Sequence, residues 1–357
     1  MAPRVVKGQP DPRIDAVEHR RRLRQLFDDP AFAPLSAEID AIADVAYEAY
    51  AAGRKAPRTR AAGPGWADPS YELSLDWLAH KAAIDEARAR HDDPDAPSRV
   101  LLVCASPRSD HTCPGEMSKS YRLLAHVQQV LAKDTELELD VLDLARLASE
   151  YGRTIHPCKG CVSTAMPLCH WPCSCYPNHA LGQVHDWMGE IYPRWVRAHG
   201  VMIVTPVHWF QVPSTLKLMM DRLVCADGGN ADPTRTRGKD PAKAKQVELA
   251  GWDYPKHLAG RAFAVVVHGD AEGVGAVRDA LRSWLTTLGL VQASEQALLG
   301  RYVGYYEPYA NSHDDLDRDQ ALLDEVGNAA HALASAVRFL RNGVAPAVEP
   351  RAEPRPK

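Results

Sequence analysis

The spacing of hydrophobic residues changes near residue 99. Before that point hydrophobic residues recur at helical intervals, which predicts helices at 14–27, 36–52 and 74–90. The stretch 54–69 is rich in proline and basic side chains, so we expect a linker or an arm without regular structure there. Residues 1–98 are therefore predicted to form a helical N-terminal extension.

From residue 99 onward, short apolar runs alternate with amphipathic stretches. The apolar runs predict five buried strands, at 100–105, 137–142, 201–205, 262–268 and 291–299. Helical patterns follow at 117–133, 181–198, 213–224, beyond Gly273 and at 315–341, whereas 226–258 is expected to be an irregular excursion. Strands that alternate with helices form right-handed crossovers, so residues 99–343 are predicted to be a doubly wound α/β domain. Residues 344–357 contain four prolines and are predicted to be a disordered tail.

Composition narrows the class of protein. The 357 residues are 45% hydrophobic and 25% charged, with a net charge of -4, which is typical of a globular protein and does not favour a nucleic-acid partner. No apolar run is long enough for a membrane helix, and the first residues lack the apolar core of a signal peptide. We therefore expect a cytoplasmic protein with neither a nucleic-acid nor a membrane partner.

Three of the expected strands end in side chains that could bind a ligand. Hydroxyl and basic residues follow the first strand, an aromatic loop at 206–211 follows the third, and the small loop 268–273 follows the fourth. Ligands of doubly wound sheets bind at the carboxyl ends of the strands, and helix N-termini attract phosphate. Phosphate donors beside a flat apolar surface favour flavin mononucleotide (FMN). The alternatives are an ordinary serine-capped loop and, for His208, Trp209 and Phe210, the capped edge of a core.

These motifs resemble those of the flavodoxin-like NADPH-dependent FMN reductases. Ala105-Ser106-Pro107-Arg108 and Ser118-Lys119-Ser120 stand where that family has its phosphate loop. Thr205-Pro206, then Pro213, Lys217 and Asp221-Arg222, match the family's next motif in spacing, although His208 replaces the usual tyrosine. Lys217 and Asp221 lie four residues apart on one expected helix, which favours a local ion pair over a catalytic role.

The resemblance implies a flavodoxin-like, five-stranded parallel sheet of order 2-1-3-4-5 and a homodimer. It also implies that FMN phosphate binds to Ser106, Arg108, Ser118, Lys119 and Ser120. The isoalloxazine ring would then be lined by Pro206, Val207, His208, Trp209, Phe210, Gln211, His268, Gly269 and Gly273. A flavin carries the reactive atoms itself, so we name no catalytic acid, base or nucleophile.

Five of the eight cysteines cluster between residues 158 and 175. Closely spaced thiolates can hold an iron–sulfur cluster or zinc, and the related iron–sulfur flavoproteins have a compact cysteine motif at this place. We expect a four-iron (4Fe-4S) cluster, zinc, or free or reversibly paired thiols at Cys158, Cys161, Cys169, Cys173 and Cys175. Cys104, Cys113 and Cys225 are predicted to be packing residues.

The leading hypothesis is an FMN-dependent oxidoreductase that takes hydride from NAD(P)H. Its acceptor would be a small molecule such as free flavin, a quinone or another electron-poor aromatic. The rival hypothesis is a non-enzymatic electron carrier, in which FMN and a cysteine-ligated iron–sulfur cluster exchange electrons with a protein partner. Rapid reduction by NADPH would separate the two, because a carrier should not show it.

Overall fold

The computed structural model describes residues 13–270, 272–309 and 311–344. The chain divides into two compact units, which we name by their main features. The cysteine unit comprises residues 1–82, 158–186 and 229–253, and the sheet unit comprises 83–157, 187–228 and 254–357. Residues 158–186 and 229–253, which were expected to belong to the 99–343 domain, therefore belong to the same unit as residues 1–82. The predicted tail beyond Val344 lies outside the described residues.

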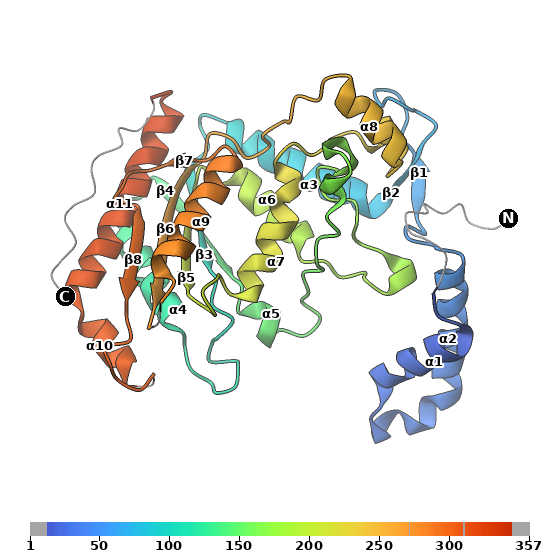
Figure 1. The fold of residues 1–357 in the computed structure, drawn as a ribbon, viewed down its shortest axis with the longest axis horizontal. Coiled ribbons are helices and arrows are strands. Elements are labelled where there is room, and N and C mark those ends of the chain that lie inside the picture. Colours follow the sequence, from blue (N-terminus) through green and yellow to red (C-terminus); the bar gives the residue numbers. More distant parts are fainter. Residues whose placement is uncertain (1–12, 271, 310, 345–357) are drawn as a thin grey trace. The chain divides into compact units, whose positions relative to one another are not determined.

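The sheet unit is built on parallel strands in the order β4-β3-β5-β6-β7, with β8 also paired to β6 (Figure 1). The bounds are β3 Ser98–Cys104, β4 Leu137–Asp143, β5 Gly200–Pro206, β6 Ala262–Gly269, β7 Val291–Gln292 and β8 Leu298–Tyr302. This order confirms the flavodoxin-like fold and the expected 2-1-3-4-5 arrangement. The last expected strand is divided in two, because a turn in which Ala297 N donates to Ser294 O separates β7 from β8.

Helices cover both faces of this sheet. They are α4 Lys119–Leu131, α5 Arg146–Ser149, α6 Met188–Arg197, α7 Ser214–Arg222, α9 Val274–Thr287, α10 Ser312–Arg318 and α11 Gln320–Arg341. Side chains of α4 and α11 pack against one face of β3, β5 and β6, where residues such as Leu102 and Val204 are fully buried. Successive side chains of a strand point to opposite faces of the sheet. Helices α6 and α9, which contact β3 and β6, pack against the second face. There Trp195 and Trp284 meet edge to face, with ring centroids 5.9 Å apart.

Two expected helices have different bounds in the structure. The helix expected at 181–198 begins only at Met188, because Gly182 adopts a left-handed conformation (φ 66°) after the 3-10 turn His179–Leu181. The helix expected at 315–341 is interrupted at Asp319. The carboxylate of Asp319 accepts a hydrogen bond from Leu322 N at 3.0 Å and so caps the start of α11.

The cysteine unit contains little regular structure outside its N-terminal helices. Its elements are α1 Ala16–Arg24, α2 Ser36–Ala51, β1 Thr59–Ala61, β2 Glu72–Ser74, the start of α3 Leu75–Asp92, and α8 Pro241–Leu249, together with the 3-10 turns Gln25–Phe27, Pro30–Leu35, Cys161–Ser163, Met166–Leu168, His179–Leu181 and Pro233–Thr236. The helices at 36–52 and 74–90 are confirmed. The expectation that 54–69 lacks regular structure is wrong for β1, which pairs with β2 in an antiparallel ribbon. Similarly, the excursion at 226–258 contains α8.

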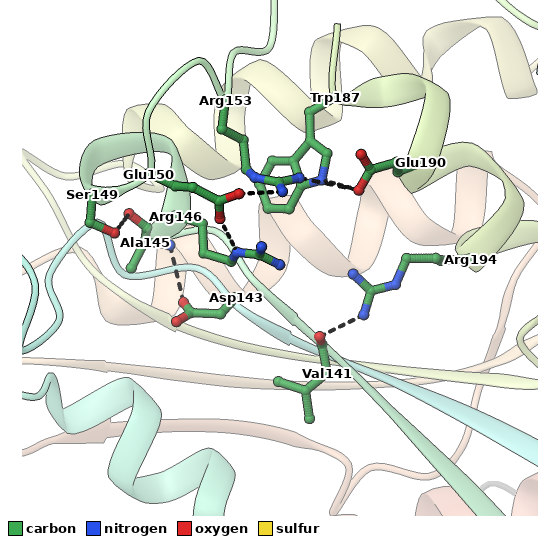
Figure 2. A network of polar contacts seen from close by, with 10 residues as sticks. All are labelled: Val141, Asp143, Ala145, Arg146, Ser149, Glu150, Arg153, Trp187, Glu190 and Arg194. Atoms are coloured by element: carbon green, nitrogen blue, oxygen red, sulfur yellow. Dashed lines mark hydrogen bonds and ion pairs between the residues drawn. The ribbon is translucent and has the colours of Figure 1, made fainter. Parts of the chain in front are cut away.

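The segments 158–186 and 229–253 are insertions that leave and re-enter the sheet unit at closed stems. At the first stem Trp187 N donates to Thr154 O at 2.8 Å. Figure 2 shows the side chains beside it: the guanidinium of Arg153 binds Glu150 at 2.5 Å and Glu190 at 3.1 Å, and lies 4.6 Å from the ring centroid of Trp187. The second stem is held by Gly228 N donating to Pro255 O at 2.8 Å. Both insertions are therefore anchored at their bases.

Within the described residues, no helix has the length and apolar character that crossing a bilayer requires.

Candidate functional site

A cavity of about 500 Å³ lies at the carboxyl ends of β3, β5 and β6 in the sheet unit. Most of the residues expected to bind FMN line it, although they come from separate parts of the chain. The lining consists of Ser106, Pro107, Arg108, Ser118, Lys119, Ser120, Pro206, Val207, His208, His268, Gly269, Asp270, Val303 and Tyr309. The structure thus brings together the three strand ends that the sequence singled out.

Hydroxyl groups surround the start of α4 on one side of this cavity. Ser118 is the N-cap of α4, and its Oγ accepts a hydrogen bond from Tyr121 N at 3.1 Å. Ser106 Oγ likewise accepts from Arg108 N at 3.1 Å. Both hydroxyls act as acceptors toward the backbone, and an O–H that accepts in this way can still donate its own proton to an anionic ligand. The N-terminus of α4 adds its own attraction for negative charge.

Two cations converge on the same wall. Arg108 pairs with Glu116 at 2.7 Å, and Lys119 is buried although it carries an ammonium group. Both stand over the ring of Tyr309, at 4.6 Å for Arg108 Cζ and 4.1 Å for Lys119 Nζ. Burial lowers the pKa of Lys119, and the nearby carboxylates of Asp270 and Glu116 oppose that shift. An anion in the cavity would further stabilise this ammonium.

Ser120 and His268 form a buried pair across the cavity. Ser120 Oγ lies 2.7 Å from His268 Nε2, and both residues are almost inaccessible to solvent. Burial, followed by the positive charge of Lys119, lowers the pKa of His268 to about 3. The imidazole is therefore neutral at physiological pH. In the Nε2-protonated tautomer it would donate to Ser120 and leave the hydroxyl proton of Ser120 for a ligand.

The loop after β5 forms the second wall and a projecting turn. Pro206, Val207 and His208 line the cavity. The turn closes through two backbone hydrogen bonds between His208 and Gln211, of 2.8 and 2.9 Å. Trp209 and Phe210 at its tip have positive φ angles of 46° and 64°, a conformation that costs non-glycine residues free energy. They project into solvent and do not line the cavity, and neither does Gln211.

The loop after β6 approaches this turn closely. Gly269 lines the cavity, whereas Gly273 packs behind the turn. Gly273 has a φ of +107°, and a Cβ at this position would lie 3.1 Å from the Cα of Phe210. Gly273 is therefore needed for the backbone path and is not part of the cavity lining. Residue 271 lies outside the described residues.

Four lining residues were not found from the sequence: Pro107, Asp270, Val303 and Tyr309. Pro107 and Asp270 lie inside loops that the sequence did single out. Val303 and Tyr309 come from the segment after β8, whose contact with α4 depends on how the chain folds back. No local pattern in the sequence indicates that contact.

The residues present fit FMN by their chemistry. Three serine hydroxyls, two cations and a helix N-terminus match a phosphate group. The apolar wall from Pro206 to His208 and the backbone of Gly269 suit a flat ring, and the volume falls within the usual range for small-molecule sites. Elsewhere in this unit, Lys217 and Asp221 form the expected local ion pair on α7.

A second group of functional side chains lies in the cysteine unit. The thiol of Cys161 is within hydrogen-bonding reach of the thiols of Cys169 and Cys175, and Cys173 is close enough to repel it. Lys239 Nζ donates to Cys175 Sγ at 3.0 Å and to Cys161 Sγ at 3.6 Å. The structure therefore gathers four of the five clustered cysteines, and it adds a lysine that the sequence did not indicate.

The charges in this group depend on one another. The thiols of Cys169 and Cys175, and then the ammonium of Lys239, hold the pKa of Cys161 well below its usual range. Burial alone would lower the pKa of Lys239, but attraction to Cys175, Cys173 and Cys161 outweighs burial and raises it. Burial and the charge of Lys239 lower the pKa of the buried lysine Lys55 to about 8.

The expectation of a metal at these cysteines stays a prediction. Among the residues that the structure describes, no three or more His, Cys, Asp or Glu side chains are arranged to hold a single metal ion. Outside the cluster, Cys104 and Cys225 are buried, as expected of packing residues. The same expectation is wrong for Cys113, which is exposed because its loop extends beyond the core.

Comparison with known proteins identifies the family. None of the curated proteins matches the chain. Solved structures with a similar fold include RosB with bound 8-demethyl-8-formylriboflavin-5'-phosphate, at 15% identity over 69% of this chain and 81% of that chain, with a TM-score of 0.47. An azoreductase from Bacillus anthracis str. Sterne matches at 13% identity over 65% of this chain and 98% of that chain, with a TM-score of 0.36.

The family model of the NADPH-dependent FMN reductases matches residues 98–304, which is more than half of the chain. That span contains all three strand ends that form the cavity. The chain belongs to the NADPH-dependent FMN reductase family and is an NAD(P)H-dependent oxidoreductase.

Proposed function

We propose that the cavity at the carboxyl ends of β3, β5 and β6 holds FMN and that the protein reduces a small acceptor with NAD(P)H. The observation that carries this proposal is the composition of the cavity wall. Hydroxyls and cations gather at the start of α4, whereas Pro206 and Val207 add apolar surface from the loop after β5 and Gly269 adds bare backbone from the loop after β6. A planar ring system that carries a phosphate group would interact with both sides of the cavity, and FMN has this composition.

The residues of this chain would bind and orient the cofactor. Ser106, Ser118 and Ser120 would donate to the phosphate, and Lys119 and Arg108 would balance its charge. Pro206, Val207 and His208 would fix the plane of the ring, with Gly269 allowing close backbone approach. When bound, FMN supplies the hydride chemistry, so the protein needs no acid or nucleophile of its own.

The acceptor would be a small electron-poor molecule such as free flavin, a quinone or another aromatic. The turn that lines the cavity also carries the exposed side chains of Trp209 and Phe210. Aromatic groups of this kind offer stacking surfaces to planar acceptors. They also support a homodimer, because aromatic side chains are enriched where protein surfaces bind one another.

The test is the flavin content of purified protein together with its reduction by NADPH. We expect wild-type protein to retain about one FMN per chain and to bleach rapidly on mixing with NADPH in a stopped-flow instrument. Ser106→Ala and Ser120→Ala should retain less FMN, because each removes a donor from the phosphate wall. Cys113→Ser, an exposed site outside the cavity lining, is the control. Unchanged flavin content in both serine variants would show that the phosphate binds elsewhere.

The second candidate is an electron carrier that combines FMN with a cysteine-ligated iron–sulfur cluster. The proximity of Cys169 and Cys175 to the thiol of Cys161 favours it. It requires about four irons per chain in anaerobically purified protein and no rapid bleaching by NADPH. Flavin without iron, reduced quickly by NADPH, would exclude this candidate.

A further inference from the structure

The clustered cysteines of the cysteine unit are packed between two segments of the chain. Cys169, Cys173 and Cys175 are buried, whereas Cys161 is partly exposed. Residues from the second insertion enclose them: Asn230 N donates to Cys169 O at 2.7 Å, and Trp171 N donates to Asn230 O at 2.8 Å. The sulfurs are thus held by two segments that lie far apart in the sequence.

Lys239 is positioned between two of the sulfurs. Its ammonium donates to Cys175 Sγ at 3.0 Å and lies 3.6 Å from Cys161 Sγ, and the residue is partly exposed to solvent. Gly238 precedes it with a φ of +77°, and a Cβ there would collide with the hydroxyl of Tyr71. This close approach fixes the backbone from which Lys239 reaches the sulfurs.

The two sulfurs that share Lys239 differ in access. Cys161 can be reached from solvent, whereas Cys175 has only 4% of its surface exposed. Both sulfurs nevertheless lie within 3.6 Å of one atom, Lys239 Nζ, so they are close neighbours. An accessible thiol, a buried neighbour and an ammonium beside both are the parts that thiol–disulfide exchange requires.

We propose that Cys161 and Cys175, with Lys239 as a positioning residue, form a redox-active dithiol that exchanges with low-molecular-weight disulfides. This site lies outside the FMN cavity, and the inference does not depend on the proposed flavin function. Cys161 is the attacking thiol because it is accessible, and Cys175 is the resolving thiol because it is buried beside it.

The exchange balances in two steps. The thiolate of Cys161 attacks one sulfur of an oxidised disulfide such as glutathione disulfide, and the S–S bond breaks to release one thiol, which takes up a proton. The thiolate of Cys175 then attacks Cys161 Sγ and expels the second thiol. The two protein thiols lose two electrons and form one disulfide, and the external disulfide gains the two electrons as two thiols.

The ammonium of Lys239 favours this path. Its Nζ donates to Cys175 Sγ and to Cys161 Sγ, so one ammonium holds both sulfurs at the same place, and its charge helps to lower the pKa of the attacking thiol of Cys161. Lys55, buried nearby, donates to the backbone of Ser174, so the two ammonium groups occupy separate places around the loop.

The first experiment uses full-length wild-type protein with its natural ligands. Fully reduced protein is incubated with glutathione disulfide, alkylated, digested and mapped by mass spectrometry, and zinc and iron are quantified on the same sample. We expect the loss of two thiols per chain, one peptide pair joined through Cys161 and Cys175, and full reversal by dithiothreitol.

Single substitutions separate the roles of the two cysteines. Cys175→Ser should trap one glutathione on Cys161, because the resolving thiol is missing. Cys161→Ser should leave Cys175 unmodified, because Cys175 is buried. Lys239→Met should slow formation of the disulfide by about tenfold, and Lys239→Arg should restore part of the rate because it keeps the charge. Cys113→Ser, which removes an exposed cysteine outside this group, should behave as wild type.

Three results would overturn the proposal. One is that Cys161, Cys169, Cys173 and Cys175 all remain free thiols under oxidising conditions. Another is a disulfide that joins Cys161 to Cys169 instead of Cys175. The third is about one zinc or four irons per chain that protect these cysteines from alkylation, which would assign them to a metal centre. The mass-spectrometric mapping uses wild-type protein, so it tests the proposal even if a substitution prevents folding.

Discussion

Ser120 and His268 illustrate how single residues in the cavity are fixed by partners far along the chain. Their hydrogen bond of 2.7 Å joins the first turn of α4 to the end of β6. Buried polar groups cost free energy unless they are paired, so each residue stabilises the placement of the other. The pair also gives the sheet unit a defined dependence on pH.

We predict that the stability of the protein falls as the pH drops from about 6.5 toward 3. Burial lowers the pKa of His268 to about 3, whereas in the unfolded chain it returns to about 6.5. Between these pH values His268 is protonated in the unfolded chain but not in the folded chain, so lowering the pH favours unfolding. His268→Gln, which keeps a hydrogen-bonding side chain without the titration, should make this part of the profile less steep in denaturant unfolding measured across pH, while His91 and His199, whose pKa values burial also lowers, keep their share of the slope.

The control for this prediction is His331→Gln, at a solvent-exposed position on α11. It should leave the slope between pH 6.5 and 3 as in wild type. Parallel profiles for wild type and His268→Gln would contradict the prediction.

Lys119 is predicted to provide a large part of the attraction for the FMN phosphate. It is a buried ammonium in the cavity wall, and a charged hydrogen bond of this kind contributes about 1.5–3 kcal/mol. Lys119→Met should therefore weaken FMN binding at least about tenfold, and added salt should weaken binding less in the variant than in wild type. Fluorescence titration of apoprotein with FMN measures both effects.

Lys217→Met provides the matched control, because Lys217 is half-exposed and paired with Asp221 away from the cavity. It should bind FMN as wild type does. Equal affinities for the Lys119 and Lys217 variants would refute the role of Lys119.

At the scale of elements, β5 and α11 are in unusually close contact. A Cβ at Gly200 on β5 would lie 2.6 Å from Val337 Cγ2 and 3.2 Å from Leu333 Cδ1, both on α11. Buried side chains cannot give way without strain, so the helix can approach the sheet this closely only because residue 200 is glycine.

Gly200→Ala should therefore destabilise the protein by about 1–3 kcal/mol. Gly275→Ala is the matched comparison, because Gly275 lies in α9 with no neighbour within 4 Å of the added Cβ, and alanine favours helix there by about 0.5–1 kcal/mol. Denaturant midpoints should move in opposite directions. A shift of similar size and sign in both variants would contradict this account of the packing.

The two anchored insertions are also features of whole elements. The stem at Trp187 is closed by backbone pairing and by the Arg153 network of Figure 2, and the stem at Gly228 by backbone pairing with Pro255. Stems of this kind let a parallel sheet carry long irregular segments without disturbing its strand order.

At the scale of the whole molecule, we predict a homodimer that covers the turn at Trp209. The side chain of Trp209 is 94% exposed on a strained turn beside the cavity. Light scattering coupled to size exclusion should give twice the mass of one chain. Trp209→Ser should raise the dimer dissociation constant at least about tenfold, as expected for a buried aromatic anchor.

Tyr151→Ser tests an equally exposed aromatic residue elsewhere in the sheet unit and should leave the dimer intact. A monomeric wild-type protein, or equal dissociation constants for the two variants, would contradict the prediction.

The alternation of apolar runs and helical patterns determined the α/β fold of this protein, because each strand and helix is encoded by its own local periodicity. Motif spacing likewise indicated three strand ends, and parallel strands bring such ends to one edge of the sheet. Elements that are short or bury few residues carry little periodic signal, which explains why β1, with three residues, and α8, in which only Ala244 is buried, were missed, together with the break at Asp319.

Only the tertiary structure decided which distant residues complete each site. Tyr309 reaches Lys119 from the segment after β8, and Lys239 reaches Cys161 and Cys175 from the second insertion. Such contacts depend on the path of the chain between elements, which no local pattern records. The sequence by itself therefore determined the sheet and its ligand-bearing edge, whereas folding placed the aromatic ring over the cations of one site and the ammonium between the thiols of the other.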